Sequence, residues 1–345
     1  MITRRAFAGL AAASLPLLRN RRARAAALTP VTIVQSSISF NFVPIYIAQT
    51  AGYFKQEGID LSVVLAGGGP KAMTGLIGGG GQFSASVLFD GMMAHRRGLT
   101  DVRALATLSL FQNPMAILTT VAKQRGITLD MPLKQRLEAM KGLRIGMTTP
   151  GATSDMFMRY LFRANGMNPD RDLQIIPLGG VSAQIAALQA GRVDGCSCLP
   201  PVDVIANTQG LTTEVLDRLK DIPLLSGVTY GTLYGLDSYN KAHPEVTNAM
   251  ARALARATLL LTHDPDAAKQ ATRPFLKELD QATYDAAWNT YFPEMPRTLD
   301  ITSDSFDKEL AFEKAVLPAR DDAPLKYDDV VDASFVRRAM QQVSR

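Results

Sequence analysis

The stretch from residue 31 to residue 65, VTIVQSSISFNFVPIYIAQTAGYFKQEGIDLSVVL, predicts one repeat of an α/β fold. Its first five residues are mostly β-branched and are typical of a short strand. Pro44 then favours the first turn of a helix, which we expect to end at Gly52. Residues 61–65 are again apolar and β-branched. Strand, helix and strand in this order indicate a parallel sheet covered by helices.

The same alternation continues along the chain. Two further strands are expected at 83–87 and 102–108, and the pattern restarts at residue 143 with strands at 143–147, 173–178 and 193–199. From His243 onward the apolar residues follow helical spacing. The apolar series that carries this last prediction is Val246, Met250, Leu254, Ala257 and Leu261. The sequence therefore predicts two α/β units followed by a helical C-terminal third.

The charge is concentrated at the N-terminus. The 345-residue chain has a formal charge of +5, and residues 1–25 hold six arginines and no acid, so the remainder carries 5 − 6 = −1. Nucleic-acid binding needs clustered Lys and Arg. A nucleic-acid partner is therefore not expected.

Residues 1–27 are typical of an export signal. Arg4 and Arg5 form a twin-arginine pair, an apolar stretch runs from Phe7 to Leu18, and small residues near Ala25–Ala27 offer a cleavage site. The apolar stretch is shorter than the roughly 20 residues that span a bilayer. We expect cleavage near Ala25–Ala27 and a periplasmic location. An N-terminal anchor helix, a basic tail and export by the general route are the alternatives.

The two cysteines, Cys196 and Cys198, lie two residues apart. On an ideal strand such residues are about 6.6 Å apart, near the upper limit for a disulfide. We therefore expect two small buried residues on one face of a strand, without a disulfide. A zinc site is the weaker alternative, since no His lies nearby.

Several short motifs together resemble the nitrate/sulfonate/taurine group of ABC-transporter solute-binding proteins, which share their fold with thiamine-pyrimidine synthases. The resemblance spans roughly residues 30–340, and its strength is the order and spacing of the motifs. These are Pro44-Ile45-Tyr46-Ile47-Ala48, Gly52-Tyr53-Phe54, Glu57-Gly58-Ile59-Asp60-Leu61, Lys141-Gly142-Leu143-Arg144-Ile145-Gly146, Pro150-Gly151-Ala152-Thr153-Ser154 and Ala187-Leu188-Gln189-Ala190-Gly191-Arg192-Val193-Asp194.

The resemblance implies an α/β fold of the periplasmic binding protein type II kind, a two-lobed clamshell in which each lobe is a mixed sheet flanked by helices. Lobe one would comprise residues 28–110 and 228–345, and lobe two residues 114–224. The chain would cross between them near 109–114 and 224–230, and these crossings would form a hinge. A ligand would bind between the lobes and close them.

In lobe two, the loop from Thr148 to Ser154 is the strongest candidate for ligand contact. It joins a strand to a helix, so that free backbone amides and the positive end of the helix would face the cleft. Gly151 would allow close approach, and Thr149, Thr153 and Ser154 supply hydroxyls. Ala152, within the same loop, is also a candidate contact. Such a site suits an oxyanion or a carboxylate. Helix capping by the same side chains is the alternative.

In lobe one, the candidates follow the ends of strands, where ligands of open α/β sheets bind. They are Ser36, Ser37, Phe40 and Asn41 after the first strand, Gly67 and Gly68 after the second, and Ser86 and Val87 at the third. Phe111 and Tyr230 could stack on a ligand, and Gly179 lies at a strand end of lobe two. Tight turns, satisfied hydroxyls and core aromatics are the alternatives.

We therefore expect an extracytoplasmic, monomeric binding protein that delivers a small anionic organic ligand, of the sulfonate, taurine or nitrate type, to the permease and ATPase of an ABC importer. No enzyme activity, cofactor or metal is expected. A ligand-sensing protein and a thiamine-pyrimidine synthase are the alternatives. The synthase alternative is weakened because Ser86 and Asp90 fall where fungal synthases need a Lys and a His, and without that Lys no pyridoxal phosphate aldimine can form.

Overall fold

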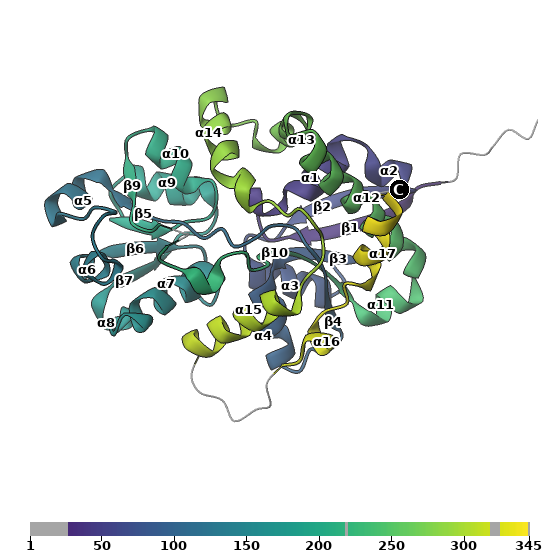
Figure 1. Ribbon diagram of the computed structural model, residues 1–345, viewed down its shortest axis with the longest axis horizontal. Helices are drawn as coiled ribbons and strands as arrows, with labels where there is room; N and C mark the ends of the chain where they lie inside the picture. The colour runs from purple at the N-terminus through teal and green to yellow at the C-terminus, as the bar shows by residue number, and fades with distance from the viewer. Residues whose placement is uncertain (1–26, 218–219, 318–324, 344–345) are drawn as a thin grey trace, which may run out of the picture.

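The computed structural model describes residues 27–217, 220–317 and 325–343, so the expected export signal lies outside the described residues except for Ala27. Two five-stranded sheets form the centres of two lobes (Figure 1). Both sheets are mixed and both are flanked by helices. The α/β architecture of two mixed sheets expected from the sequence is confirmed.

The first sheet has the strand order β2-β1-β3-β10-β4. β1, β2 and β3 are parallel, and β10 is inserted antiparallel between β3 and β4, although it follows them by more than a hundred residues in the chain. The elements up to β4 are β1 (Thr29–Gln35), η1 (Phe40–Phe42), α1 (Val43–Thr50), α2 (Tyr53–Gln56), β2 (Ile59–Leu65), α3 (Gly69–Ile77), β3 (Phe83–Val87), α4 (Leu88–Arg96) and β4 (Val102–Thr107).

The second sheet has the order β7-β6-β8-β5-β9. β6 is parallel to β7 and β8, whereas β5 is antiparallel to both of its neighbours. Its elements are β5 (Met115–Leu118), α5 (Thr119–Arg125), α6 (Leu133–Ala139), β6 (Arg144–Met147), α7 (Thr153–Ala164), α8 (Pro169–Asp172), β7 (Gln174–Pro177), α9 (Val181–Gln189), β8 (Gly195–Ser197), α10 (Val202–Thr208) and β9 (Thr212–Glu214).

The rest of the chain returns to the first lobe and is mainly helical. All five residues that predicted α12 by their helical spacing are buried. The elements are η2 (Pro223–Leu225), β10 (Gly231–Leu236), α11 (Asp237–Ala242), α12 (Pro244–His263), α13 (Pro265–Thr272), η3 (Arg273–Leu276), α14 (Gln281–Tyr291), η4 (Phe292–Glu294), α15 (Ser303–Val316), α16 (Tyr327–Val330) and α17 (Ser334–Val343). Among the helices at described positions, none is long and apolar enough to cross a membrane.

The chain passes between the two sheets twice, once between β4 and β5 and once between β9 and β10. The two passages are paired, since Phe111 N donates to Val228 O and Tyr230 N donates to Ser109 O, each at 2.8 Å. Leu110 and Thr229 form an isolated antiparallel bridge between them.

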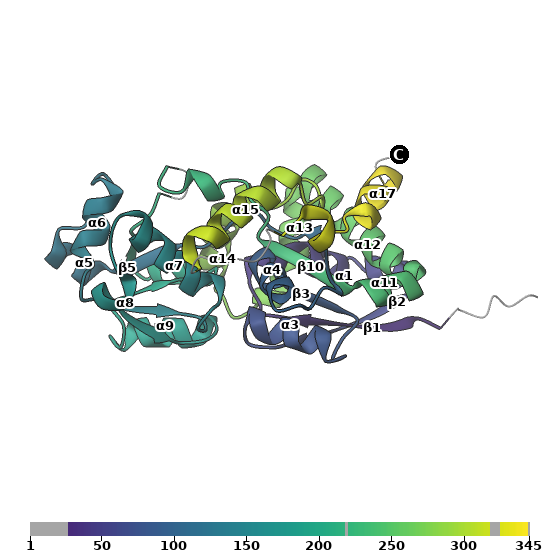
Figure 2. The same ribbon diagram turned by 90° about the horizontal axis from the view of Figure 1, so that it is seen from below.

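Helix α15 joins the two lobes on one side (Figure 2). Its Phe306 belongs to the apolar core of the first lobe, while Phe312 and Val316 belong to the core of the second. The side chain of Arg163 on α7 donates to Val316 O at 2.6 Å. The first turn of α15 is held by Ser305, whose hydroxyl accepts from Thr229 N in the second passage.

Gly231 lies where β10 begins, and a side chain there has no room. A Cβ atom would overlap the carbonyl oxygen of Asn41, and the Ser109 hydroxyl would be only 2.7 Å away. We expect Gly231→Ala to lower the melting temperature by roughly 3–8 °C, because the backbone of η1 has to move. Thermal unfolding followed by circular dichroism measures this. The control is Gly180→Ala, where a Cβ meets nothing within 4 Å. Equal stability of the two variants would contradict the close packing of β10 on η1.

Candidate functional site

A cavity of about 70 Å³ lies at the carboxyl ends of six parallel strands, three from each sheet. It is lined by segments that follow β1, β2 and β3 in the first lobe and β6, β7 and β8 in the second. Eleven of the sequence-predicted site residues line it: Ser36, Ser37, Asn41, Gly67, Gly68, Val87, Ala152, Thr153, Ser154, Gly179 and Tyr230. Their role in binding stays a prediction.

Three other candidates lie behind the lining of this cavity. Phe40 is fully buried and stacks on Tyr291 with ring centroids 5.3 Å apart, so it belongs to the core of the first lobe. Phe111 packs edge-on against Tyr230 at 5.0 Å and supports that ring from behind. Ser86 is buried and donates its hydroxyl hydrogen bond to Asp90.

Thr149 and Gly151, from the loop before α7, are also absent from the lining. Gly151 has a φ of +78°, a conformation that favours glycine, and its amide donates to Asp155 Oδ2 at 2.9 Å. Thr149 faces the other lobe, because a Cβ added to Gly68 would lie 3.4 Å from its hydroxyl. Gly151 therefore shapes the loop, and Thr149 lies where the two lobes approach each other.

The start of α7 presents unpaired donors to the cavity. Ser154 accepts hydrogen bonds from Thr148 N at 3.1 Å and exchanges one with the Thr148 hydroxyl at 2.8 Å, so its oxygen is used within the loop. Ala152 is the N-cap residue, and no side chain caps the helix there. In the described part of the chain, the amides of Thr153 and Ser154 have no hydrogen-bond partner. Ser154 and Asp155 thus hold the loop before α7, and helix capping, the alternative for this loop, does not occupy these two amides.

Thr153 is the side chain at this end of α7 that remains available. It is 3 % exposed and lies beside the Tyr230 phenol, yet its hydroxyl makes no hydrogen bond of ordinary geometry within the described residues. A buried hydroxyl without a partner is costly. A polar ligand atom in the cavity would supply that partner.

Asp90, on the first turn of α4, is the acid of the cavity and was not among the predicted ligand contacts. It is 5 % exposed, and its Oδ2 accepts from the Ser86 hydroxyl and, at 3.4 Å, from Val87 N. Position 69, which lies against Asp90 and Ser86, has room only for glycine, because a Cβ there would overlap Asp90 Oδ2. Burial raises the pKa of Asp90 to about 6. Its position just after a strand end was the signal that could have identified it.

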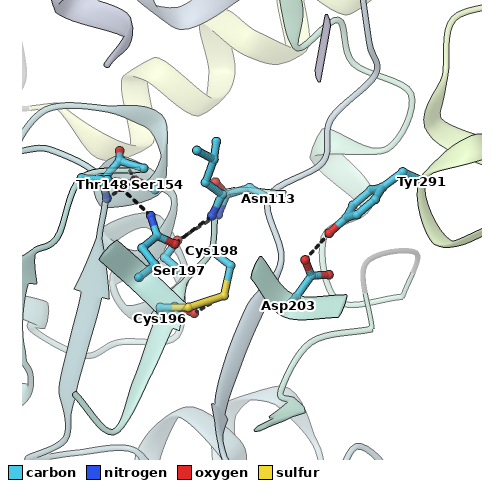
Figure 3. Close-up of a disulfide and its surroundings, with 11 residues drawn as sticks. Asn113, Thr148, Ser154, Cys196, Ser197, Cys198, Asp203 and Tyr291 are labelled. Carbon is cyan, nitrogen blue, oxygen red and sulfur yellow. Dashed lines mark hydrogen bonds between the residues drawn. A yellow bond between two sulfur atoms is a disulfide. The ribbon is translucent and has the colours of Figure 1, made fainter. Parts of the chain in front are cut away.

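Asn113, in the first passage between the lobes, also lines the cavity and was missed. Its side-chain amide donates to the Ser197 hydroxyl at 2.8 Å (Figure 3). Its side-chain oxygen accepts from the Tyr230 hydroxyl at 3.3 Å. These bonds connect β8 of the second lobe with the second passage. Asn113 therefore fixes the Tyr230 ring at the wall of the cavity.

Cys196 and Cys198 form a disulfide, so the expectation of two unbridged cysteines is wrong (Figure 3). The Cα atoms are 5.1 Å apart, closer than on an ideal strand, because β8 ends at Ser197 and the chain turns there. Cys198 lines the cavity, together with Leu199. Within the ranges that the structure describes, no group of three metal-ligating side chains is found.

On the side of α14, outside this cavity, the lobes are joined by a hydrogen bond and separated by a second cavity. Tyr291 on α14 donates to Asp203 on α10, and both side chains are buried (Figure 3). A second, more open cavity of about 500 Å³ lies between α9 and the segment around Leu276 and Leu279, with mostly apolar walls. It shares Ser36, Ser37, Gly67 and Gly180 with the smaller cavity. The two cavities are therefore neighbouring parts of one cleft.

The described lining of the smaller cavity contains no lysine. The position that the resemblance matches to the lysine of fungal synthases is occupied by Ser86 near the end of β3, whose hydroxyl donates a hydrogen bond to Asp90. The cavity thus offers no amine to which pyridoxal phosphate could attach, and the residues present do not fit that cofactor.

The sequence model of the NMT1-like family matches residues 38–274. Among curated proteins, the chain is 28 % identical over 225 residues to the bicarbonate transport ATP-binding protein CmpC of Synechocystis, an alignment of 62 % of this chain and 32 % of CmpC. It is 26 % identical over 259 residues to 4-amino-5-hydroxymethyl-2-methylpyrimidine phosphate synthase THI5 of Saccharomyces cerevisiae, covering 72 % of this chain and 71 % of THI5. The chain thus spans about a third of the length of CmpC.

Solved structures share the fold. A protein from Bordetella bronchiseptica superposes with a TM-score of 0.80 at 24 % identity, over 92 % of this chain and 98 % of that one. The periplasmic nitrate-binding protein NrtA of Synechocystis superposes with a TM-score of 0.70 at 16 % identity, over 92 % and 89 %. The two-lobed periplasmic binding protein fold inferred from the sequence motifs is confirmed.

Glu309, on α15, is a buried acid close to the cavity but not part of its lining. Burial, together with the charges of Asp90 and Glu313, raises the pKa of Glu309 from 4.5 to about 8. Its Oε2 has no hydrogen-bond partner in the described structure, whereas Glu313 is paired with Arg96 at 2.6 Å. The folded protein therefore keeps a proton on Glu309 over a pH range in which the unfolded chain has lost it.

This difference in pKa makes the stability of the fold depend on pH. The stabilisation is full below pH 4.5 and is lost as the pH rises to about 8, at no more than about 1.4 kcal/mol per pH unit. Glu309→Gln keeps the shape of the protonated acid but does not titrate. We expect its melting temperature to rise relative to the wild type between pH 5 and pH 8, by roughly 2–3 °C per unit. Both proteins contain Asp90, so the effect of its titration on the melting temperature largely cancels in the difference between variant and wild type. A difference that does not change with pH would show that Glu309 is ionised in the folded protein.

Proposed function

The chain belongs to the NMT1-like family, and from this premise we propose that it is the solute-binding protein of an ABC importer. In this proposal a small solute enters the cleft between the lobes, the lobes close on it, and the closed form docks on the permease. The permease and its ATPase are the partners, and the binding protein acts as a monomer. No covalent chemistry is involved.

The observation that carries the proposal is the cavity at the carboxyl ends of β1, β2, β3, β6, β7 and β8. Both lobes contribute to its wall, so a solute bound there contacts both. Interactions with both lobes favour the closed arrangement, which is what couples binding to closure. The names of the relatives agree with this role, since CmpC is named for bicarbonate transport and NrtA for nitrate binding.

The two passages of the chain between the sheets are the proposed hinge, at residues 109–114 and 224–230. Lobe one would consist of residues 28–110 with 228–345, and lobe two of residues 114–224. The cleft sits beside the passages, since Asn113 and Tyr230 belong to its wall. Small backbone rotations there would open and close it.

The solute would bind the amides of Thr153 and Ser154 through an oxygen atom. These amides lie at the positive end of a 12-residue helix, where an electronegative group is stabilised. An anionic organic solute, such as a sulfonate or a carboxylate, provides such an oxygen.

A second candidate function is a pyrimidine synthase, which the similarity to THI5 favours. Purified protein incubated with pyridoxal phosphate distinguishes the two functions. After free pyridoxal phosphate and its exchangeable adducts with surface lysines are removed by gel filtration, a cofactor held in the cavity would keep a visible absorption band, whereas a binding protein would keep none. Formation of that band would support the synthase and contradict the proposal.

We further propose that residues 1–27 direct export and are removed near Ala25–Ala27, which places the mature protein in the periplasm. Arg4 and Arg5 carry the proposal of the twin-arginine route, and the basic residues Arg19, Arg21, Arg22 and Arg24 disfavour the general route. The body of the chain that follows is nearly neutral.

The role of the cavity is tested by Thr153→Val, which removes a hydroxyl and keeps the shape of the side chain. We expect nitrate, bicarbonate, sulfonates or amino-substituted derivatives to raise the melting temperature of the wild type. The variant should bind the same solute about 3- to 10-fold more weakly, because one hydrogen bond is lost. Isothermal titration calorimetry measures the affinity. Thr212→Val is the control, since its buried hydroxyl is also unpaired but lies outside the cavity. Equal binding by Thr153→Val and the wild type would remove Thr153 from the site.

The export route is tested by replacing Arg4 and Arg5 together with lysine. We expect the double variant to remain in the cytoplasm as an uncleaved precursor, because the twin-arginine route depends on this pair. Cell fractionation with immunoblotting separates precursor from mature protein. Replacing Arg21 and Arg22 with lysine is the control and should leave export unchanged. Normal export of the Arg4 and Arg5 variant would indicate the general route.

A further inference from the structure

We propose that the cleft selects solutes that carry a protonated amino group, and that the Asp90 carboxylate binds this group. The inference rests on the proposed function, because it assumes that the cavity at the strand ends is the solute site. It narrows the solute class from anions in general to molecules that combine an ammonium group with an oxygen acceptor.

The first argument is the geometry of Asp90. Its carboxyl group is nine-tenths or more buried and forms part of the cavity wall. Oδ2 is occupied by the Ser86 hydroxyl and Val87 N. Oδ1 has no hydrogen-bond partner among the residues described. One oxygen is therefore fixed by the protein, and the other is left for a donor that enters the cavity.

The second argument is the charge of the cavity wall. Asp90 is the acid of this wall, and no Lys, Arg or His is part of it as far as the chain is described. Arg96 pairs with Glu313, and Arg97 lines a neighbouring cavity that Asp90 also borders, so neither arginine belongs to the wall of the solute cavity. An inorganic anion would meet a carboxylate without any compensating side-chain charge. Two like charges this close repel each other strongly in a buried site. An ammonium group at the same place turns this repulsion into attraction.

The third argument is the distribution of donors and acceptors over the two lobes. In the first lobe, the side-chain oxygen of Asn41 has no hydrogen-bond partner, and the hydrogen bonds of the Asp90 carboxylate within the described residues go to Oδ2. The second lobe presents unpaired donors, the amides of Thr153 and Ser154 at the start of α7. A solute with an ammonium group at one end and an oxygen group at the other satisfies both walls. Such a solute bridges the lobes, and this bridging is the requirement for closure.

The size of the cavity limits the solute. A volume of 70 Å³ corresponds to about five to seven water molecules when one water needs about 10–15 Å³ by the same measure. A short zwitterion of a few heavy atoms fits this volume. Apolar substituents could extend into the larger cavity beside it.

Binding through Asp90 also has a pH dependence. The groups that interact with Asp90 are Ser86 and Val87 beside it, Tyr230 from the second passage, Tyr234 from β10, Glu309 from α15, and Arg97 after α4. Burial raises its pKa to about 6, and protonation removes the charge that attracts the ammonium group. The affinity for an amine should therefore be constant above pH 7, up to the pH at which the solute loses its own ammonium proton, and should fall up to tenfold for each unit below pH 6.

The experiment compares matched solutes that differ in one amino group. The pairs are taurine with ethanesulfonate, β-alanine with propionate, and γ-aminobutyrate with butyrate, titrated by calorimetry at pH 7.5. For at least one pair we expect the amine to bind the wild type at least tenfold more tightly than its partner. Asp90→Asn should reduce that preference to less than threefold. Glu309→Gln is the control, because it makes the same acid-to-amide change at a neighbouring buried residue outside the cavity wall, and it should keep the preference.

Each outcome separates the inference from the proposed function. Tight binding of ethanesulfonate, propionate or butyrate without an amine preference would overturn the role of Asp90 and leave the solute-binding function intact. An amine preference that persists in Asp90→Asn would likewise overturn it. Absence of binding by both members of every pair up to 10 mM would overturn the inference, and binding of nitrate or bicarbonate by the same protein would leave the proposed function intact.

Discussion

The packing of α15 against two separate cores is the interaction on which the rest of the structure depends. One helix places Phe306 in the core of the first lobe and Phe312 and Val316 in the core of the second. Burying large aromatic side chains at both ends is strongly favourable, so α15 holds the two lobes together at one side. The carboxyl ends of six parallel strands consequently face each other across a narrow space. The cavity is the part of this space that side chains do not fill.

The two walls of the cavity differ in electrostatic character. The second lobe offers the start of a helix, with backbone donors fixed in place by the loop that Ser154 and Asp155 stabilise. The first lobe offers a carboxylate whose second oxygen is held by Ser86, with Gly69 leaving room for the pair. For the first lobe to attract anions as well, its wall would need basic side chains. The described lining of the cavity contains none. The contrast between the walls gives a bound solute a defined orientation, because only one direction pairs donors with acceptors.

Much of the fold could be predicted from local patterns. The alternation of strands and helices, the helical spacing in α12 and the clustering of loops at strand ends all follow from short-range periodicity. The side chains that depend on tertiary packing could not be predicted in this way. Phe40 follows a strand end as Ser36 does, yet its large ring is buried among Tyr284 and Tyr291. Asn113 enters the cavity wall only because the first passage pairs with the second, a contact between residues more than a hundred positions apart. The disulfide was missed because the expected spacing assumed a regular strand, whereas the chain bends at the end of β8.

The pairing of the two passages has a consequence for how the chain tolerates length changes. Hydrogen bonds from Phe111 to Val228 and from Tyr230 to Ser109 join the passages into a short antiparallel ribbon. Inserting one residue into either strand of such a ribbon shifts its register and turns alternate side chains to the opposite side. An insertion near Leu110 would thus rotate Phe111 and Asn113 away from Tyr230, even though nothing in the second strand had changed. A change in the length of one strand would therefore need a matching change in the other. The paired ribbon thus fixes the distance between the two lobes on this side.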